Sequence, residues 1–158
     1  YIDDRWLYEQ ESYLPPVNEL NLKNEKPAIS LAGEDITIVA SGYSSYLSRK
    51  TAKKLNNENI FPEVIDVRIL NPLNIKDIVN SVKKTKRLLV VDPGWISSGF
   101  SAELIAKVVE NLDVNCLISP PARIALPDAP APTSKNLEKK YYTSVDDIYI
   151  KTKEILKK

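Results

Sequence analysis

Short apolar runs alternate with longer amphipathic runs along the chain from Gly33 onward. The apolar runs are rich in β-branched and other aliphatic residues, which favour strands. The predicted strands cover residues 36–40, 61–67, 87–91 and 114–118. The amphipathic runs repeat apolar side chains at helical spacing. The predicted helices cover residues 43–55, 75–84 and 100–112, and a last one runs from 144 to the end.

This alternation predicts an α/β fold. Right-handed crossovers would place helices on both faces of a mostly parallel sheet, which makes a three-layer sandwich. The run at 87–91 (RLLVV) is almost continuously apolar, as expected of a central strand covered on both faces. The last helix opens on a capping-box pattern, Ser144 followed by Asp147. The proline-rich stretch at 119–133 is expected to be an extended surface segment.

Residues 1–32 show no sustained period, and two adjacent prolines at 15 and 16 interrupt regular structure. We interpret them as a connector from a missing upstream domain, and residues 33–158 as one domain. The connector carries four aromatic residues, so part of it should lie against a folded surface. The chain starts at Tyr1 without methionine, which favours a piece of a longer polypeptide.

Composition excludes several classes of function. Lysine plus arginine number 22 against 21 aspartate plus glutamate, so the chain has almost no net positive charge with which to attract nucleic acid. The longest apolar runs are far shorter than the ~20 residues that cross a bilayer. The chain has no histidine, so histidine-dependent triads and zincin sites cannot form within it.

The single cysteine, Cys116, lies in the apolar stretch 114–118. No disulfide framework can form from one cysteine, and a buried thiol is expected rather than a reactive one. This cysteine usage fits a reducing compartment, so we expect a cytoplasmic protein.

Three polar residues stand where two predicted strands end. Asp66 and Arg68 end the second strand, and Asp92 directly follows the third. The carboxyl ends of parallel strands meet at one edge of a sheet, where α/β folds place their sites. The three residues are therefore candidates for a polar cluster at the sheet edge, although an ion pair between Arg68 and an acid with a structural role is the favoured interpretation.

The segment after the third strand carries Gly94 and Gly99 before the next helix. A tight turn permitted by glycine is favoured over an anion site at that helix N-terminus, because neither GxGxxG nor a Walker lysine is present. Large apolar side chains on such a turn favour contact with another subunit. The interface candidates are Trp95, Ile96, Phe100 and Glu103.

Four segments of this sequence resemble, in the same order along the chain, sequence motifs of the transketolase C-terminal domain family. They are residues 33–42 (GEDITIVASG), 64–73 (VIDVRILNPL), 89–104 (LVVDPGWISSGFSAEL) and the proline-rich tail at 127–138. The likeness spans about residues 33–150 and is strongest to the β subunits of pyruvate and branched-chain 2-oxo acid dehydrogenases. The opening residues 1–8 (YIDDRWLY) resemble the segment that leaves the pyrimidine-binding domain in such subunits.

The resemblance implies a sheet of about five strands and a noncatalytic assembly and docking domain in an oxidoreductase. The full enzyme would use thiamine diphosphate and a divalent metal such as magnesium for oxidative decarboxylation of a 2-oxo acid, with the cofactor supplying the carbanion chemistry. It implies no catalytic, cofactor-binding or metal-binding residue in this chain. Implied partners are the upstream domain, an α subunit or homologous diphosphate-binding domain within a homo- or hetero-oligomer, and a lipoyl acyltransferase core.

Two alternatives stay open. The chain can be an independent small-ligand or regulatory binding domain on the same α/β scaffold, because fold alone does not fix function. It can also be the C-terminal domain of a transketolase or of a deoxyxylulose phosphate synthase.

Overall fold

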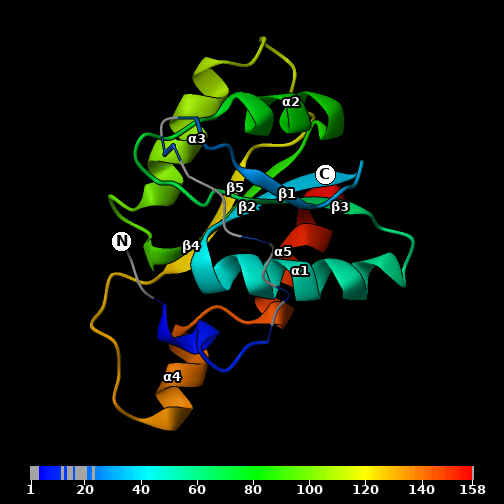
Figure 1. Cartoon of the computed structure of the whole chain (residues 1–158). Helices are drawn as coiled ribbons and strands as arrows, with labels where there is room; N and C mark the ends of the chain where they lie inside the picture. The colour runs from blue at the N-terminus through cyan, green and yellow to red at the C-terminus, as the bar shows by residue number, and fades with distance from the viewer. Residues whose placement is uncertain (1–3, 12, 14–15, 17–20, 23, 158) are drawn as a thin grey trace.

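A computed structural model describes residues 4–11, 13, 16, 21, 22 and 24–157 of the chain. In this described part the chain forms one five-stranded sheet with the order β1-β3-β2-β4-β5 (Figure 1). The strands are β1 (Ala28–Leu31), β2 (Ile36–Ala40), β3 (Pro62–Asp66), β4 (Leu88–Trp95) and β5 (Ala122–Leu126). All neighbours pair in parallel except β1, which is antiparallel to β3.

Helices lie on both faces of the sheet, as Figure 1 shows. The helices of the described part are η1, a 3-10 helix (Arg5–Leu7), and the α-helices α1 (Gly42–Asn56), α2 (Lys76–Thr85), α3 (Phe100–Glu110), α4 (Lys135–Tyr141) and α5 (Val145–Leu156). Helices α1 and α5 pack in one core cluster, and α2 and α3 pack in another on the opposite face. The predicted three-layer α/β sandwich with a mostly parallel sheet of about five strands is therefore confirmed.

The two cores arise from the alternation of side chains along the buried strands. In β2, Ile38 joins the cluster under α1 and α5, whereas its neighbour Val39 joins the cluster under α2 and α3. Successive side chains of a strand point to opposite faces, so a strand covered on both sides is mostly apolar, and the one polar residue of β2, Thr37, is hydrogen-bonded to Ser81 and Thr85. All five residues of β2 are buried. This strand, rather than β4, occupies the middle of the sheet.

The last strand is not where the sequence predicts it. Residues 114–118 form turns and loop, and Val114 is 91% exposed. The strand β5 forms instead within the stretch predicted to be an extended surface segment. Prolines at 120 and 121 precede β5 and Pro127 follows it, so none removes a donor from its hydrogen bonds to β4. Cys116, predicted to be buried with that strand, is half-buried.

The stretch interpreted as a connector contributes to the fold at two places. Residues 28–31 form β1 at one edge of the sheet, so the sheet begins before residue 33. Further upstream, η1 lies against the start of α1, as the aromatic content predicts. Tyr1 and Pro15, which enter the interpretation of this connector, lie outside the described residues. Within the described residues, no helix is long and apolar enough to span a bilayer.

Candidate functional site at the carboxyl edge of the sheet

Strands β2, β3 and β4 lie side by side at the carboxyl edge of the sheet, where β2 and β3 end and β4 continues to Trp95. Ala40, the last residue of β2, pairs with Asp66 on one side and with Val91 on the other. Asp92 follows Val91, so Asp66 and Asp92 lie along the same edge with β2 between them. This is the edge at which doubly wound sheets hold ligands, and the sequence correctly places both carboxylates there.

Asp92 binds backbone amides rather than a cation. Its side chain is 3% exposed, and its carboxylate accepts hydrogen bonds from the amides of Gly94 at 2.8 Å and Ser101 at 2.6 Å. Gly99 stands at the N-cap of α3 and has no side chain to cap it. Asp92 therefore closes the turn and supplies the capping acceptor of α3, a position where the helix dipole favours a negative charge.

The turn after β4 depends on glycine at one position. A Cβ atom placed on Gly99 would lie 2.0 Å from the carbonyl oxygen of Trp95, which is far inside van der Waals contact. Gly94 is less constrained, since its Cβ would meet the Asp92 carboxylate at 3.1 Å. This geometry agrees with the favoured interpretation of a tight turn permitted by glycine.

Arg68 forms an ion pair with a residue that sequence reasoning missed. Its guanidinium lies 3.0 Å from the carboxylate of Glu25 and donates to the carbonyl oxygen of Lys26 at 3.5 Å. The Asp66 carboxylate instead accepts from the Arg68 backbone amide at 3.2 Å. Among the described residues, no ion pair joins Arg68 to Asp66 or Asp92. The three residues share an edge without forming one charged cluster.

The interface candidates differ in what they present to solvent. Trp95 is 58% exposed, and its indole N–H donates to the Tyr141 hydroxyl at 3.2 Å. Ile96 is half-buried, and its amide donates to the Leu126 carbonyl oxygen at 2.8 Å. Phe100 packs against the core under α3. Glu103 is exposed and pairs with Lys107 at 3.2 Å. Trp95 therefore offers the largest free apolar surface among the four.

An aromatic group next to this edge was not predicted as a unit. The Trp6 ring makes edge contacts with Tyr43 at 5.1 Å and Tyr142 at 4.6 Å between ring centroids. Tyr142 in turn contacts Tyr141 at 5.0 Å. The only sequence signal was the aromatic richness of residues 1–13, which indicates that they pack but not against which surface.

Residues 26–148 match the family model of the transketolase C-terminal domain. The chain belongs to this family. The resemblance recognised in the sequence phrases at 33–42, 64–73 and 89–104 is thereby confirmed.

Sequence relatives of this transketolase C-terminal domain are β subunits of pyruvate dehydrogenase. It is 38% identical over 154 residues to the E1 component subunit beta-1, mitochondrial, of Arabidopsis thaliana, covering 94% of this chain and 41% of that protein. It is 36% identical over 132 residues to the mitochondrial E1 subunit beta of Dictyostelium discoideum, covering 82% of this chain and 34% of that protein. The chain thus spans about a third to two fifths of these relatives' length.

Solved structures share the fold. A split-gene transketolase, described as an inactive beta4 tetramer, superposes with a TM-score of 0.70 at 21% identity, covering 92% of this chain and 48% of that one. A 2-oxoglutarate:ferredoxin oxidoreductase from Magnetococcus marinus superposes with a TM-score of 0.59 at 14% identity, covering 84% of this chain and 20% of that one. At these identities the similarity establishes the architecture of the transketolase C-terminal domain alone.

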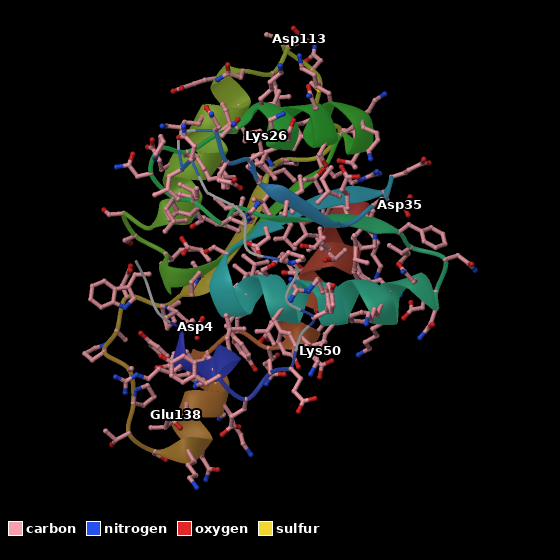
Figure 2. All side chains as sticks on the ribbon, viewed as in Figure 1. Asp4, Lys26, Asp35, Lys50, Asp113 and Glu138 are labelled. Carbon is pink, nitrogen blue, oxygen red and sulfur yellow. The ribbon has the colours of Figure 1, made fainter. Side chains whose placement is uncertain are left out.

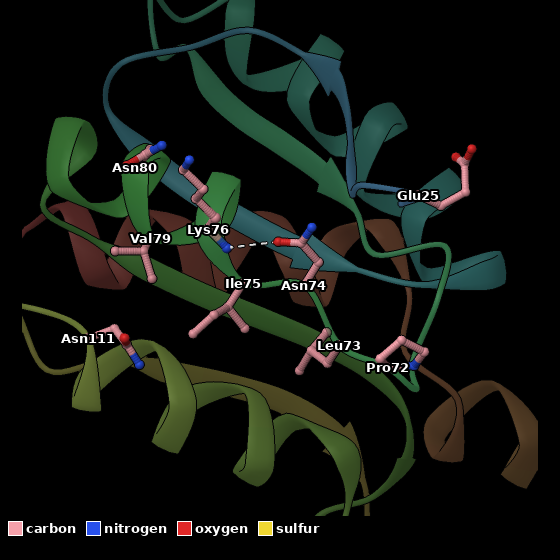
Figure 3. A pocket seen from close by; sticks show the side chains of 9 residues that line it. All are labelled: Glu25, Pro72, Leu73, Asn74, Ile75, Lys76, Val79, Asn80 and Asn111. Carbon is pink, nitrogen blue, oxygen red and sulfur yellow. Dashed lines mark hydrogen bonds between the residues drawn. The ribbon is translucent and has the colours of Figure 1, made fainter. Parts of the chain in front are cut away.

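A pocket of about 530 Å³ opens between the start of α2, the end of α3 and the segment before β1 (Figure 3). Its polar lining comes from Glu25, Asn74, Lys76, Asn80 and Asn111. The Asn74 side chain accepts a hydrogen bond from the amide of Lys76, the first residue of α2, at 3.2 Å. Among the described residues, no group of three or more histidine, cysteine or acidic side chains could hold a metal ion.

Proposed function

We propose that this transketolase C-terminal domain is an assembly and docking domain of a 2-oxo acid dehydrogenase β subunit, with pyruvate-type decarboxylation carried out by the full enzyme. The observation that carries this proposal is the 38% identity over 154 residues to a pyruvate dehydrogenase E1 component subunit beta. In the full enzyme, thiamine diphosphate with a divalent metal such as magnesium would supply the carbanion chemistry.

The carboxyl edge of the sheet offers little that would hold this cofactor. A diphosphate with its magnesium needs free backbone amides, cations and oxygen ligands. At the carboxyl edge, the Ser101 amide at the start of α3 already donates to Asp92, and the Arg68 guanidinium is paired with Glu25. This hydrogen bond and this ion pair support the proposal that the reacting atoms are held in other domains of the enzyme. We therefore assign no catalytic or cofactor-binding role to this chain.

The exposed indole of Trp95 supports a contact role for this edge. Tryptophan is enriched among the residues that dominate binding energy at interfaces, and this one is the last residue of β4, directly before the turn that Asp92 and Gly99 shape. The partner we propose is the α subunit or the upstream domain of the same polypeptide, within a larger oligomer. A lipoyl acyltransferase core is a further partner of the assembled enzyme. We retain the cytoplasm as the proposed location, although some relatives are mitochondrial.

Replacement of Trp95 tests the contact role. In the β subunit that carries this domain, Trp95→Ala should weaken association with the α subunit roughly 30-fold, the equivalent of the ~2 kcal/mol typical of an interface hot spot. The matched control is Ile29→Ala, since Ile29 is 54% exposed on β1 at the other side of the sheet. Isothermal titration calorimetry measures both. Equal affinities for the two variants and the unmodified subunit would refute the contact role of Trp95.

The pocket beside α2 favours a second candidate function, that of a small-ligand or regulatory domain. Its volume of about 530 Å³ lies within the range of small-molecule sites, and its lining combines apolar walls with amide, amine and carboxylate groups. Equilibrium dialysis against nucleotides and sugar phosphates separates the two functions. Specific binding below millimolar concentration would favour the regulatory function over the assembly function.

A further inference from the structure

Asp4 caps a helix that begins 38 residues later in the chain. Ser41, the N-cap residue of α1, makes no side-chain capping bond. The carboxylate of Asp4 accepts the amide hydrogen of Tyr43 at 2.9 Å and that of Trp6 at 3.3 Å. Figure 2 shows Asp4 beside the start of α1. An N-cap acceptor satisfies an amide that has no partner within the helix, so Asp4 supplies from the connector what the local sequence of α1 lacks.

The backbone at Gly42, the first residue of α1, leaves room for the Asp4 carboxylate. Gly42 has φ +53°, and a Cβ atom at that position would lie 3.2 Å from the Asp4 carboxylate oxygen. A side chain there would both strain the backbone and crowd the carboxylate. The positive φ and the close approach of Asp4 thus both favour glycine at position 42.

Trp6 extends this contact toward the exposed Trp95. The Trp6 ring contacts Tyr142 edge-on, and Tyr142 contacts Tyr141 edge-on at an interplanar angle of 88°. The Tyr141 hydroxyl accepts the Trp95 indole N–H at 3.2 Å and donates to the Ala129 carbonyl oxygen at 2.7 Å. A continuous series of side-chain contacts therefore joins the connector to the turn after β4.

Helix α4, which carries Tyr141, depends on these contacts for its position. It has seven residues and none of its side chains is buried. A helix this short is not stable without tertiary packing, and exposed helices with few apolar contacts lie at the low-stability end of a fold. Loss of the Trp6 contact should therefore loosen α4 and with it the hydrogen bond from Trp95 to Tyr141.

We infer that Asp4 and Trp6 form a latch that couples docking of the connector to the position of Trp95. The connector latch, defined as these two residues, holds the start of α1 through Asp4 and holds α4 through Trp6. When the latch is docked, the Trp95 indole is fixed by Tyr141. When it is undocked, the indole loses that partner. The latch goes beyond the proposed assembly function, because it concerns contacts within this chain and stands whatever partner Trp95 meets.

Nuclear magnetic resonance of the chain tests this coupling directly. The sequence has two tryptophans, so a ¹H–¹⁵N spectrum contains two indole signals, and Trp6→Phe assigns them. Asp4→Ala should speed exchange of the Tyr43 amide roughly fivefold, the equivalent of the ~1 kcal/mol typical of an N-cap side chain. In the same variant, the Trp95 indole signal should move toward its position in Tyr141→Phe.

Three further variants make the result decisive. Asp4→Asn should move the Trp95 signal less than Asp4→Ala does, because asparagine keeps one oxygen that can cap the Tyr43 amide but loses the second acceptor that meets the Trp6 amide. Trp6→Leu leaves one indole signal, that of Trp95, and should shift it even if Asp4→Ala does not fold. Glu11→Ala removes an exposed carboxylate of the same connector and should change neither signal. A native Trp95 signal in folded Asp4→Ala or in Trp6→Leu would overturn the coupling.

Discussion

The Asp92 carboxylate accepts the amide hydrogen of Ser101 at 2.6 Å and thereby joins the end of β4 to the first turn of α3. A second bond, from the Gly94 amide at 2.8 Å, fixes the turn between them. One buried side chain thus sets the geometry of the edge that presents Trp95. Asp92, a candidate for the polar cluster at the sheet edge, is therefore a structural hydrogen-bond acceptor.

Removal of this carboxylate should destabilise the domain. Asp92→Ala leaves the partly buried amide of Gly94 and the buried amide of Ser101 without acceptors, which we expect to cost about 1–3 kcal/mol in the free energy of unfolding. Asp92→Asn retains one oxygen acceptor and should cost less. The control is Asp113→Ala, since Asp113 is 89% exposed in its pair with Lys83 and should change stability by less than about 0.5 kcal/mol. Urea denaturation measures all three, and equal losses for Asp92→Ala and Asp113→Ala would contradict the structural role.

The two glycines of the same turn should respond differently to alanine. In Gly99→Ala the new methyl group would meet the Trp95 carbonyl oxygen, part of the backbone, at 2.0 Å, so the turn must move at a cost of about 1–3 kcal/mol. In Gly94→Ala the methyl meets a side-chain oxygen at 3.1 Å and should cost less. Thermal unfolding of both variants checks the order. A Gly94→Ala variant that is the less stable of the two would refute this geometry.

Stability should depend on pH through Glu63, a side chain 4% exposed on β3. Burial tends to raise the pKa of this carboxyl, but hydrogen bonds from Lys84, Ser81 and the Gly33 amide outweigh burial and hold the pKa below its usual value near 4.5. A carboxyl whose pKa is lower in the folded state stabilises the fold above its unfolded pKa, and this contribution disappears as pH falls through the folded pKa.

The comparison of native chain with Glu63→Gln isolates this contribution. Both should be followed by urea denaturation from pH 7 down to pH 3. The native chain should be the more stable near neutral pH, and its advantage should shrink once pH falls below about 4.5. Lys84→Met should also be destabilising at neutral pH, because it leaves a buried carboxylate with fewer donors. An advantage that stays constant from pH 7 to pH 3 would rule out the assigned role of Glu63.

Helices α1, α2, α3 and α5 and the central strands could be predicted from the sequence because their signals are local, whereas the short helices η1 and α4 were not predicted. Helix α1 follows the amphipathic run at 43–55, and α5 opens on the capping box between Ser144 and Asp147 that the sequence indicates. The strand β2 was equally clear, since burial on both faces demands an apolar run. Each of these elements carries its own period, turn or cap in consecutive residues.

The sequence-based predictions were wrong or incomplete where the strand or side chain that pairs with an element is distant in the sequence. The run at 114–118 is as apolar as a strand, yet the pairing with β4 goes to residues 122–126, beyond two prolines. Strand β1 was missed because its pairing with β3 is long-range. For the same reason Glu25 was not recognised as the partner of Arg68, nor Asp4 as the cap of α1. Local pattern cannot select among such partners, because tertiary packing decides them.

The central claim is that this transketolase C-terminal domain provides contact area while the reacting atoms are held elsewhere. The most direct test is isothermal titration of the chain with thiamine diphosphate and magnesium, followed by an assay of carbon dioxide release from pyruvate. We predict no saturable binding and no release above the buffer rate. Saturable binding of the cofactor together with turnover by the chain alone would contradict the claim.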